Sequence, residues 1–400
     1  MARRSEDPSL LAGSGHFVAD VAQANTLHLA FLRSPHAHAR IVRFDAATAA
    51  QLPGVVKILS GAEIGQLVPS LPILWPCGDP KTRTRPLAAT DVARYVGEPI
   101  AAVVASSRYT AEDALDQIEV EYEPLDTVAS IEQALADDAP LLFPEWHENI
   151  IGTVVFGDPS LQPQGAFVLR ERFTIARLAG VPIEARGALA QYEPASGELT
   201  LWASTQVPTP LRIVVAEALG MPQAKVRVIA PDIGGGFGNK DAPHPEEIVT
   251  ALAAKLLGRP VQWIEDRREA MLAIPQARGQ IHDLELAVDG DGVILSLRDE
   301  IAVEVGAHLA SVGLGPGLIT AAMLPGPYHV PLFYARVRGV ITNKTPLGAY
   351  RGFGMPEATF AIERALDQVA RRLDVDPAEL RRRNLIRPEE MPFRTPTRLE

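Results

Sequence analysis

Residues 225–241, KVRVIAPDIGGGFGNKD, constrain the fold of this chain more than any other stretch. An apolar, β-branched run typical of a strand ends at Pro231 and is followed by three consecutive glycines, Phe237 and another glycine. Consecutive glycines cost backbone entropy, so folded proteins keep them where φ must be positive or where a ligand approaches the main chain. Ahead of a helix, such a loop presents N–H groups to an anion or to a cofactor's oxo and phosphate groups. The stretch predicts a ligand-binding loop, with a tight connection that binds nothing as the alternative.

A second stretch, AYRGFGMPE at 349–357, repeats the Gly-Phe-Gly tripeptide. Both tripeptides follow a strand pattern and a proline and precede a helical pattern, so we expect the two loops to serve one ligand. Arg351 lies beside the second tripeptide, where a buried arginine is costly unless an anion or a carbonyl faces it. Gln206, in WASTQVP, is a third candidate because its amide donates and accepts between a strand and a helix; an ordinary loop glutamine is the alternative.

The two familiar nucleotide motifs do not fit the first loop. A P-loop ends in Gly-Lys-Ser/Thr, but Asn239 replaces its glycine and Asp241 replaces its hydroxyl residue. The dinucleotide pattern G-x-G-x-x-G also fails at Asn239. A nucleotide-binding protein is therefore the least favoured function.

Charge and cysteine content restrict the partners. The chain of 400 residues has a formal net charge of -11, which disfavours nucleic acid as a partner. Its single cysteine, Cys77, excludes an internal disulfide and any iron–sulfur or zinc site built from several thiolates of this chain, and it has no local catalytic signature. We find no apolar stretch long enough to span a membrane and no signal peptide, so a cytoplasmic protein is expected.

The order of predicted elements indicates an α+β fold. We expect a small α/β domain at 10–128, an acidic linker at 129–150 and a larger domain at 151–400. One helix should begin at Pro210 with Thr209 as its N-cap, and another should run from Pro245 to Gly258. The patterns also predict a hairpin over 283–305 with an Asp-Gly turn, and a long helix over 357–375.

A few other polar residues could carry chemistry. His36 and His38 share one face of a strand, but no third metal ligand is close in sequence. Glu98 fits a turn cap better than a general base, and His244 with Glu246 and Glu247 reads as a helix start. No G-x-S-x-G nucleophile motif occurs.

Taken together, these motifs resemble the molybdenum-cofactor subunit of the xanthine dehydrogenase, aldehyde oxidase and aerobic carbon monoxide dehydrogenase family. FLRSPHAHARI, VGEPIAAVVA and DALDQIEVEYEPL are similar to the family's N-terminal hammerhead domain. STQ, VIAPDIGGGFGNK, GRPVQWIEDR and AYRGFG are similar to its first molybdopterin-binding domain. The resemblance covers nearly the whole chain and implies both domains.

The resemblance also implies roles for individual residues. Cofactor binding falls to Gln206, Gly235, Gly236, Phe237, Gly238 and Arg351, of which Gln206, Phe237 and Arg351 would surround molybdenum. Gln206 matches the glutamine that binds an oxo ligand of the metal. Phe353 and Asp241 match residues that face the substrate.

By the same resemblance, the reaction hydroxylates an electron-poor carbon with oxygen from water. The implied cofactor is molybdenum–molybdopterin, expected in its cytosine dinucleotide form, with 2Fe-2S and FAD on partner subunits. Gly352 stands where copper-using members have a cysteine, and no arginine occurs over 321–331, so an aldehyde or N-heterocycle is the expected small-molecule substrate. The catalytic glutamate is expected in a complementary C-terminal molybdopterin domain or chain, and we identify no catalytic base here. The alternative is a non-catalytic assembly or binding module that retains the fold.

Overall fold

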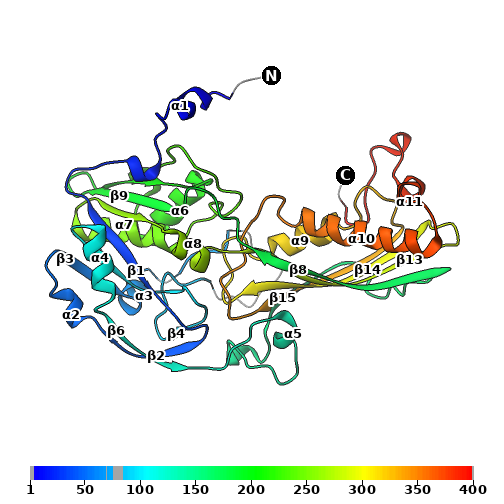
Figure 1. Cartoon of the computed structure of the whole chain (residues 1–400), viewed down its shortest axis with the longest axis horizontal. Helices are drawn as coiled ribbons and strands as arrows, with labels where there is room; N and C mark the ends of the chain where they lie inside the picture. Colours follow the sequence, from blue (N-terminus) through cyan, green and yellow to red (C-terminus); the bar gives the residue numbers. More distant parts are fainter. Residues whose placement is uncertain (1–3, 69, 75–83, 399–400) are drawn as a thin grey trace.

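The computed structural model describes residues 4–68, 70–74 and 84–398, so Cys77 lies outside the described residues. Figure 1 shows two parts lying side by side, one around a seven-stranded sheet and the other around a long five-stranded sheet. Helices accompany both sheets, in agreement with the predicted α+β class. No helix among the described residues is long and apolar enough to cross a membrane.

The seven-stranded sheet combines strands from the first and the second predicted domain. Its order is β11 (Val226–Ile229), β10 (Glu198–Ala203), β9 (Gly187–Glu193), β12 (Val261–Ile264), β1 (Leu27–Arg33), β5 (Pro99–Ala105) and β3 (Val55–Ser60). The junction is a parallel pairing of β1 with β12, with Leu27 opposite Val261 and His28 opposite Gln262. Strands from residues 10–128 and strands from residues 151–400 therefore belong to one hydrogen-bonded sheet.

Two helices that flank the first glycine loop pack against this sheet. They are α6 (Pro208–Ala218) and α7 (Pro245–Leu257), and their apolar faces join the same core. The predicted limits of α7 are confirmed, with Pro245 in its first turn and Gly258 at its end with a φ of 59°. The predicted N-cap of α6 is wrong. The helix begins at Pro208, because that proline is preorganised for a first turn and the Thr205 hydroxyl accepts the N–H of Val207 at 3.1 Å.

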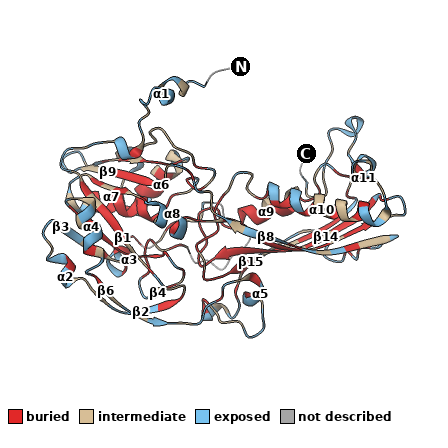
Figure 2. Ribbon diagram, in the orientation of Figure 1, coloured by how far each residue is buried: buried red, intermediate tan, exposed pale blue. Residues whose placement is uncertain are grey.

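The five-stranded sheet is built around the predicted hairpin, which is confirmed. Its order is β7 (Ile150–Gly157), β15 (Leu332–Ile341), β14 (Ile294–Gly306), β13 (Ala277–Val288) and β8 (Phe167–Leu178). The helices α9 (Gly315–Met323) and α10 (Met355–Leu373) cover one face of it in Figure 1. The predicted long helix corresponds to α10, whose buried residues recur every three or four positions and join the second core. Figure 2 shows the buried residues concentrated on the strands and on the helices against them.

The remaining elements are short. A three-stranded sheet has the order β4 (Val92–Ala93), β2 (Ala39–Asp45) and β6 (Glu119–Pro124). The other helices are α1 (Asp7–Leu11), α2 (Ala47–Ala50), α3 (Gly61–Leu67), α4 (Arg108–Leu115), α5 (Ile131–Ala134), α8 (Arg267–Ala273) and α11 (Pro377–Asn384).

A buried network of charged side chains connects β1 to the larger part of its sheet. The Arg186 guanidinium donates to Glu246 Oε2 at 2.9 Å and to Glu265 Oε1 at 3.1 Å, and Arg33 of β1 donates to Glu246 and Glu269, each at 3.0 Å. Burial alone would raise the pKa of Glu246, but Arg186 and Arg33 hold it well below its usual range. The network therefore keeps buried charges paired where the two predicted domains meet.

We expect Arg186→Met to lower the free energy of unfolding by about 3–5 kcal/mol, because it leaves two buried carboxylates without their shared cation. Urea denaturation at pH 7 measures this loss. The control is Arg172→Met, which breaks the exposed Arg172–Asp283 pair and should cost at most about 1 kcal/mol. Equal effects of the two variants would contradict a role of the network in stability.

Candidate functional site

The two Gly-Phe-Gly loops come from different sheets and meet each other. The first lies between β11 and α7, and the second lies between β15 and α10. The Arg351 N–H donates to the Phe237 carbonyl at 2.8 Å. A Cβ atom on Gly238 would lie 2.6 Å from the Ala349 carbonyl oxygen, so only glycine permits this approach. The loops predicted to serve one ligand are thus in main-chain contact.

The two tripeptides also share an unusual backbone conformation. Phe237 has a φ of 57° and Phe353 a φ of 46°, while the glycines that follow them, Gly238 and Gly354, have φ values of 103° and 96°. Positive φ is uncommon for a residue with a side chain and costs about 1–3 kcal/mol. Its occurrence at both phenylalanines indicates that the surrounding structure imposes the same turn on both loops.

Gln206 lies against the first loop and is fixed by it. The side-chain Oε1 of Gln206 accepts the Gly238 N–H at 3.0 Å, and the main-chain N–H of Gln206 donates to the Lys240 carbonyl at 2.8 Å. A Cβ on Gly236 would come within 2.3 Å of Gln206 Oε1, so a side chain there would displace the amide. With its oxygen engaged, the Gln206 amide has its NH2 group left to donate.

Two main-chain donors of the first loop are also available. Among the described residues, the N–H groups of Gly236 and Phe237 have no hydrogen-bond acceptor. The N–H of Gly238, in contrast, donates to Gln206 Oε1. Gly235, with a φ of 98°, lies behind Phe237, since a Cβ there would be 3.0 Å from the Phe237 ring.

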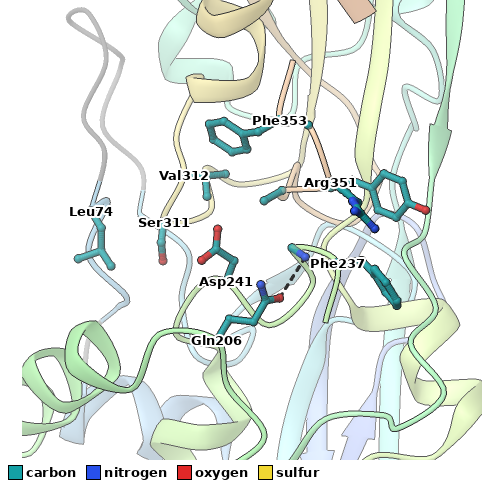
Figure 3. A pocket seen from close by; sticks show the side chains of 12 residues that line it. Leu74, Gln206, Phe237, Asp241, Ser311, Val312, Arg351 and Phe353 are labelled. Atoms are coloured by element: carbon teal, nitrogen blue, oxygen red, sulfur yellow. Dashed lines mark hydrogen bonds between the residues drawn. The ribbon is translucent and has the colours of Figure 1, made fainter. Parts of the chain in front are cut away.

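The loops and Gln206 line an open cavity of about 530 Å³, within the range of small-molecule sites. Six of the residues predicted from sequence line it: Gln206, Phe237, Gly238, Asp241, Arg351 and Phe353. Figure 3 shows Gln206 and Asp241 facing this hollow, with the hydrogen bond from Gly238 to Gln206 dashed. Gly235 and Gly236 support the cavity from behind and do not line it.

Other lining residues were missed by the sequence analysis. They are Leu74, Ser311, Val312, Ala349, Tyr350 and Gly352. Ala349, Tyr350 and Gly352 belong to the second stretch at 349–357, so the motif itself could have indicated them. Leu74 and Ser311 are joined by a hydrogen bond from the Leu74 N–H to the Ser311 carbonyl at 2.9 Å. Nothing local in either segment marks this contact between distant parts of the chain.

The charges at the cavity are Asp241 and Arg351. Partial burial raises the pKa of the Asp241 carboxyl above its ordinary value. The Arg351 side chain is exposed and has no ion-pair or hydrogen-bond partner among the described residues, so the cost of burying an unpaired arginine does not arise for it. The buried arginine at this loop is Arg278, whose Nη2 donates to the Arg351 carbonyl at 2.9 Å. The cost of burying an arginine therefore falls on Arg278, while Arg351 at the cavity wall is a cation without a partner in the described part of the chain.

A buried ion pair supports the first loop. Glu184 Oε2 accepts hydrogen bonds from Lys240 Nζ at 2.9 Å, Gly234 N at 2.8 Å and Ser204 Oγ at 2.7 Å. Burial lowers the pKa of Lys240, an effect that Glu184 opposes. The carboxylate thus joins Gly234 and Lys240, near the two ends of the first loop, to Ser204, the residue that follows β10.

The other candidate residues lie elsewhere. The His36 ring contacts Tyr122 with centroids 4.8 Å apart, and His38 Nδ1 lies 2.6 Å from the Asp126 carbonyl oxygen. Glu98 caps a turn as predicted, accepting the Arg94 N–H at 2.5 Å, and it also contacts His308 Nε2 at 2.8 Å. Within the described part of the chain, no three histidine, cysteine, aspartate or glutamate residues form a group that could hold a metal ion.

The start of α7 contains His244, Glu246 and Glu247. The prediction that these residues begin a helix is confirmed. His244 is the N-cap residue, and its N–H donates to Glu247 Oε2 at 2.9 Å. Glu246 belongs to the buried ion network. None of the three lines the cavity.

Comparison with known protein families gives two matches. Residues 142–385 match the family described as "Molybdopterin cofactor-binding domain". Residues 12–126 match "Aldehyde oxidase and xanthine dehydrogenase, a/b hammerhead domain".

Individual relatives align over almost the whole chain. The nicotine 6-hydroxylase large subunit of Paenarthrobacter nicotinovorans is 38% identical, with 98% of this chain and 48% of the relative covered. The carbon monoxide dehydrogenase large chain of Afipia carboxidovorans is 36% identical, with coverages of 98% and 50%. The crystal structure of quinoline 2-oxidoreductase from Pseudomonas putida 86 superposes with a TM-score of 0.94 at 39% identity, covering 100% of this chain and 51% of the other. The chain spans about half the length of the curated relatives it matches.

We expect Gly238→Ala to destabilise the chain clearly more than Gly220→Ala. Both glycines have positive φ, 103° and 61°, so both substitutions incur a backbone cost: about 1–2 kcal/mol at Gly220, which lies in the left-handed helical region, and more at Gly238, which lies outside it. A Cβ at position 238 would also strike the Ala349 carbonyl, whereas nothing lies within 4 Å of one at position 220. Chemical denaturation compares the variants, and hydrogen exchange at the Arg351 amide should accelerate only in Gly238→Ala. An equal loss of stability in both would contradict the loop contact.

Proposed function

Since the chain belongs to the molybdenum hydroxylase family of xanthine dehydrogenase and aldehyde oxidase, we propose that it forms the N-terminal half of the cofactor-binding subunit of such an enzyme. The substrate would be an aldehyde or an N-heterocycle. The observation that carries the proposal is the convergence of Gln206, the first glycine loop and Arg351 on one cavity.

The donors at the cavity fit a molybdenum–molybdopterin cofactor. The Gln206 NH2 group, the Phe237 N–H and the Arg351 guanidinium, the last two without a partner among the described residues, all favour oxo and phosphate oxygens. The absence of side chains at Gly236 and Gly238 leaves room for the Gln206 amide and for the Ala349 carbonyl against the first loop. When bound, this cofactor supplies the two-electron oxidation in which oxygen from water enters the substrate. We propose its cytosine dinucleotide form.

The chain's own residues would bind and orient the substrate. Val312, Phe353 and Leu74 provide apolar surface that excludes water and accommodates a planar ring. Asp241 faces the same cavity and would accept a hydrogen bond from a ring N–H or a protonated ring nitrogen. This combination favours an N-heterocycle over a simple aldehyde. The names of two relatives, a nicotine 6-hydroxylase and a quinoline 2-oxidoreductase, agree with that preference.

The remaining parts of the enzyme would come from partners. We propose that a complementary C-terminal half closes the cavity and supplies the general base. Exposed apolar side chains at the rim of the first loop offer it a contact surface: Ile183 is 93% exposed, Phe237 45% and Val181 43%. We assign the iron–sulfur and FAD centres to separate subunits, in line with relatives named as a large subunit and as a complex subunit gamma.

Molybdenum content tests the proposal directly. We expect the chain, co-expressed with the complementary half, to copurify with molybdenum detected by elemental analysis. The double variant Gln206→Ala/Arg351→Ala should reduce that content about tenfold or more, because it removes a neutral and a charged donor. Gln191→Ala/Arg172→Ala, which changes the same residue types away from the cavity, should retain it. A pure assembled complex without molybdenum would favour the assembly-module alternative.

Asp241→Asn tests the substrate assignment in the same assembled enzyme. We expect kcat/KM for a N-heterocycle to fall about tenfold or more, because the hydrogen bond loses its charged acceptor, while kcat/KM for an aldehyde changes little. In the wild type, the heterocycle activity should rise with pH as Asp241 ionises, at a pH above its ordinary range because burial raises its pKa. Asp241→Asn should remove this rise. Equal losses for both substrates would refute the assignment.

A further inference from the structure

Behind the second loop lies Arg278 of β13, which belongs to none of the motifs singled out from the sequence. Its side chain is 9% exposed. Its Nη1 donates to Glu357 Oε2 at 2.6 Å, its Nη2 donates to the Arg351 carbonyl at 2.9 Å, and its guanidinium lies 5.0 Å from the centre of the Tyr350 ring. One buried cation therefore contacts residues on both sides of the Gly-Phe-Gly turn at 352–354.

The backbone at this position departs from regular strand geometry. Arg278 and Gly279 have φ values of 67° and 62° in the otherwise extended β13. A Cβ on Gly279 would lie 2.8 Å from the Arg177 side chain, so the space there is filled. A positive φ is energetically unfavourable for an arginine. Such a conformation is kept only where the surrounding structure imposes it.

The peptide of Arg351 is held from both sides. Its N–H donates to Phe237 of the first loop, and its carbonyl accepts from Arg278. Because Glu357 neutralises Arg278, the buried pair adds no net charge behind the loop. Of the described residues at this wall of the cavity, Arg351 carries the charge that has no partner.

A second arginine holds the start of the same loop. Arg177 of β8 lies directly opposite Arg278 in the sheet, and its Nη2 donates to the Thr345 carbonyl at 2.6 Å and the Pro346 carbonyl at 3.2 Å. Neighbouring strands thus fix the loop near both of its ends through main-chain carbonyls.

We infer that Arg278 is a positioning residue: it fixes the Arg351 peptide, and with it the direction in which Arg351 and Tyr350 face the cavity. The role in an enzyme rests on the proposed function, whereas the effect on the loop does not. A lysine cannot reproduce this role. The planar guanidinium of Arg278 donates to Glu357 and to the Arg351 carbonyl at once and stacks over Tyr350, whereas a lysine has a single ammonium group.

Hydrogen exchange on the 400-residue chain tests the effect on the loop. In Arg278→Met, amides within 349–353 should exchange at least about tenfold faster, a change in opening free energy of about 1.4 kcal/mol. Arg278→Lys should keep the ion pair with Glu357 and most of the global stability, yet leave the loop exchanging fast. The matched control is Arg298→Met, which removes another strand arginine that pairs with a glutamate, at 2.8 Å from Glu300, and lies over a tyrosine ring, at 4.4 Å from Tyr334. The inference would be overturned if the loop amides exchanged no faster in Arg278→Met than in Arg298→Met. It would also be overturned if they exchanged at the wild-type rate in Arg278→Lys.

The assembled enzyme supplies an independent measurement. We expect Arg278→Lys to retain molybdenum while kcat falls about tenfold, as for a displaced binding group. An unchanged kcat in a loaded complex would overturn the positioning role. If the wild-type assembly contained no molybdenum, the proposed function would fail, and the exchange experiment would still decide whether Arg278 fixes the loop.

Discussion

The hydrogen bond between the Arg351 N–H and the Phe237 carbonyl is the contact on which the candidate site depends. It joins a loop of the seven-stranded sheet to a loop of the five-stranded sheet, so the cavity exists only where the two sheets are brought together. The contact is made by main chain because Gly238 leaves no side chain between the loops. Main-chain atoms of restrained loops are placed more reproducibly than the ends of long side chains, which suits a site that must orient a ligand.

Each of the two loops is held by a buried ion pair. Lys240 and Glu184 hold the first loop near the end of β10, where Glu184 also binds Ser204, and Arg278 and Glu357 hold the second loop between β13 and α10. Because both pairs are internally neutral, they add rigidity without filling the cavity with charge. Arg351 and Asp241 are then the two charged side chains of the described lining, one suited to an anion and the other to a ring N–H.

Much of the site could be predicted from the sequence. The glycine run, the repeated Gly-Phe-Gly and Gln206 are local signals, because each depends on residues that are neighbours in the chain. The family resemblance, which the comparisons confirm, rests on the same motifs. Leu74, Ser311 and Arg278 could not be found in this way, since each owes its role to contacts with segments far away in sequence. The exposure of Arg351 could not be predicted for the same reason, because whether an arginine is buried depends on which elements pack over it.

The parallel pairing of β1 with β12 also has a consequence for how the chain folds. Leu27 and Val261 are paired although more than half of the 400-residue chain lies between them. Such long-range pairings form late, because the entropy of closing a long loop is lost before the contact stabilises it. During synthesis from the N-terminus, β1 must therefore wait for β12 to emerge before the seven-stranded sheet can close. Until then one edge of β1 remains open to strands of other chains, which makes this interval the most exposed to aggregation.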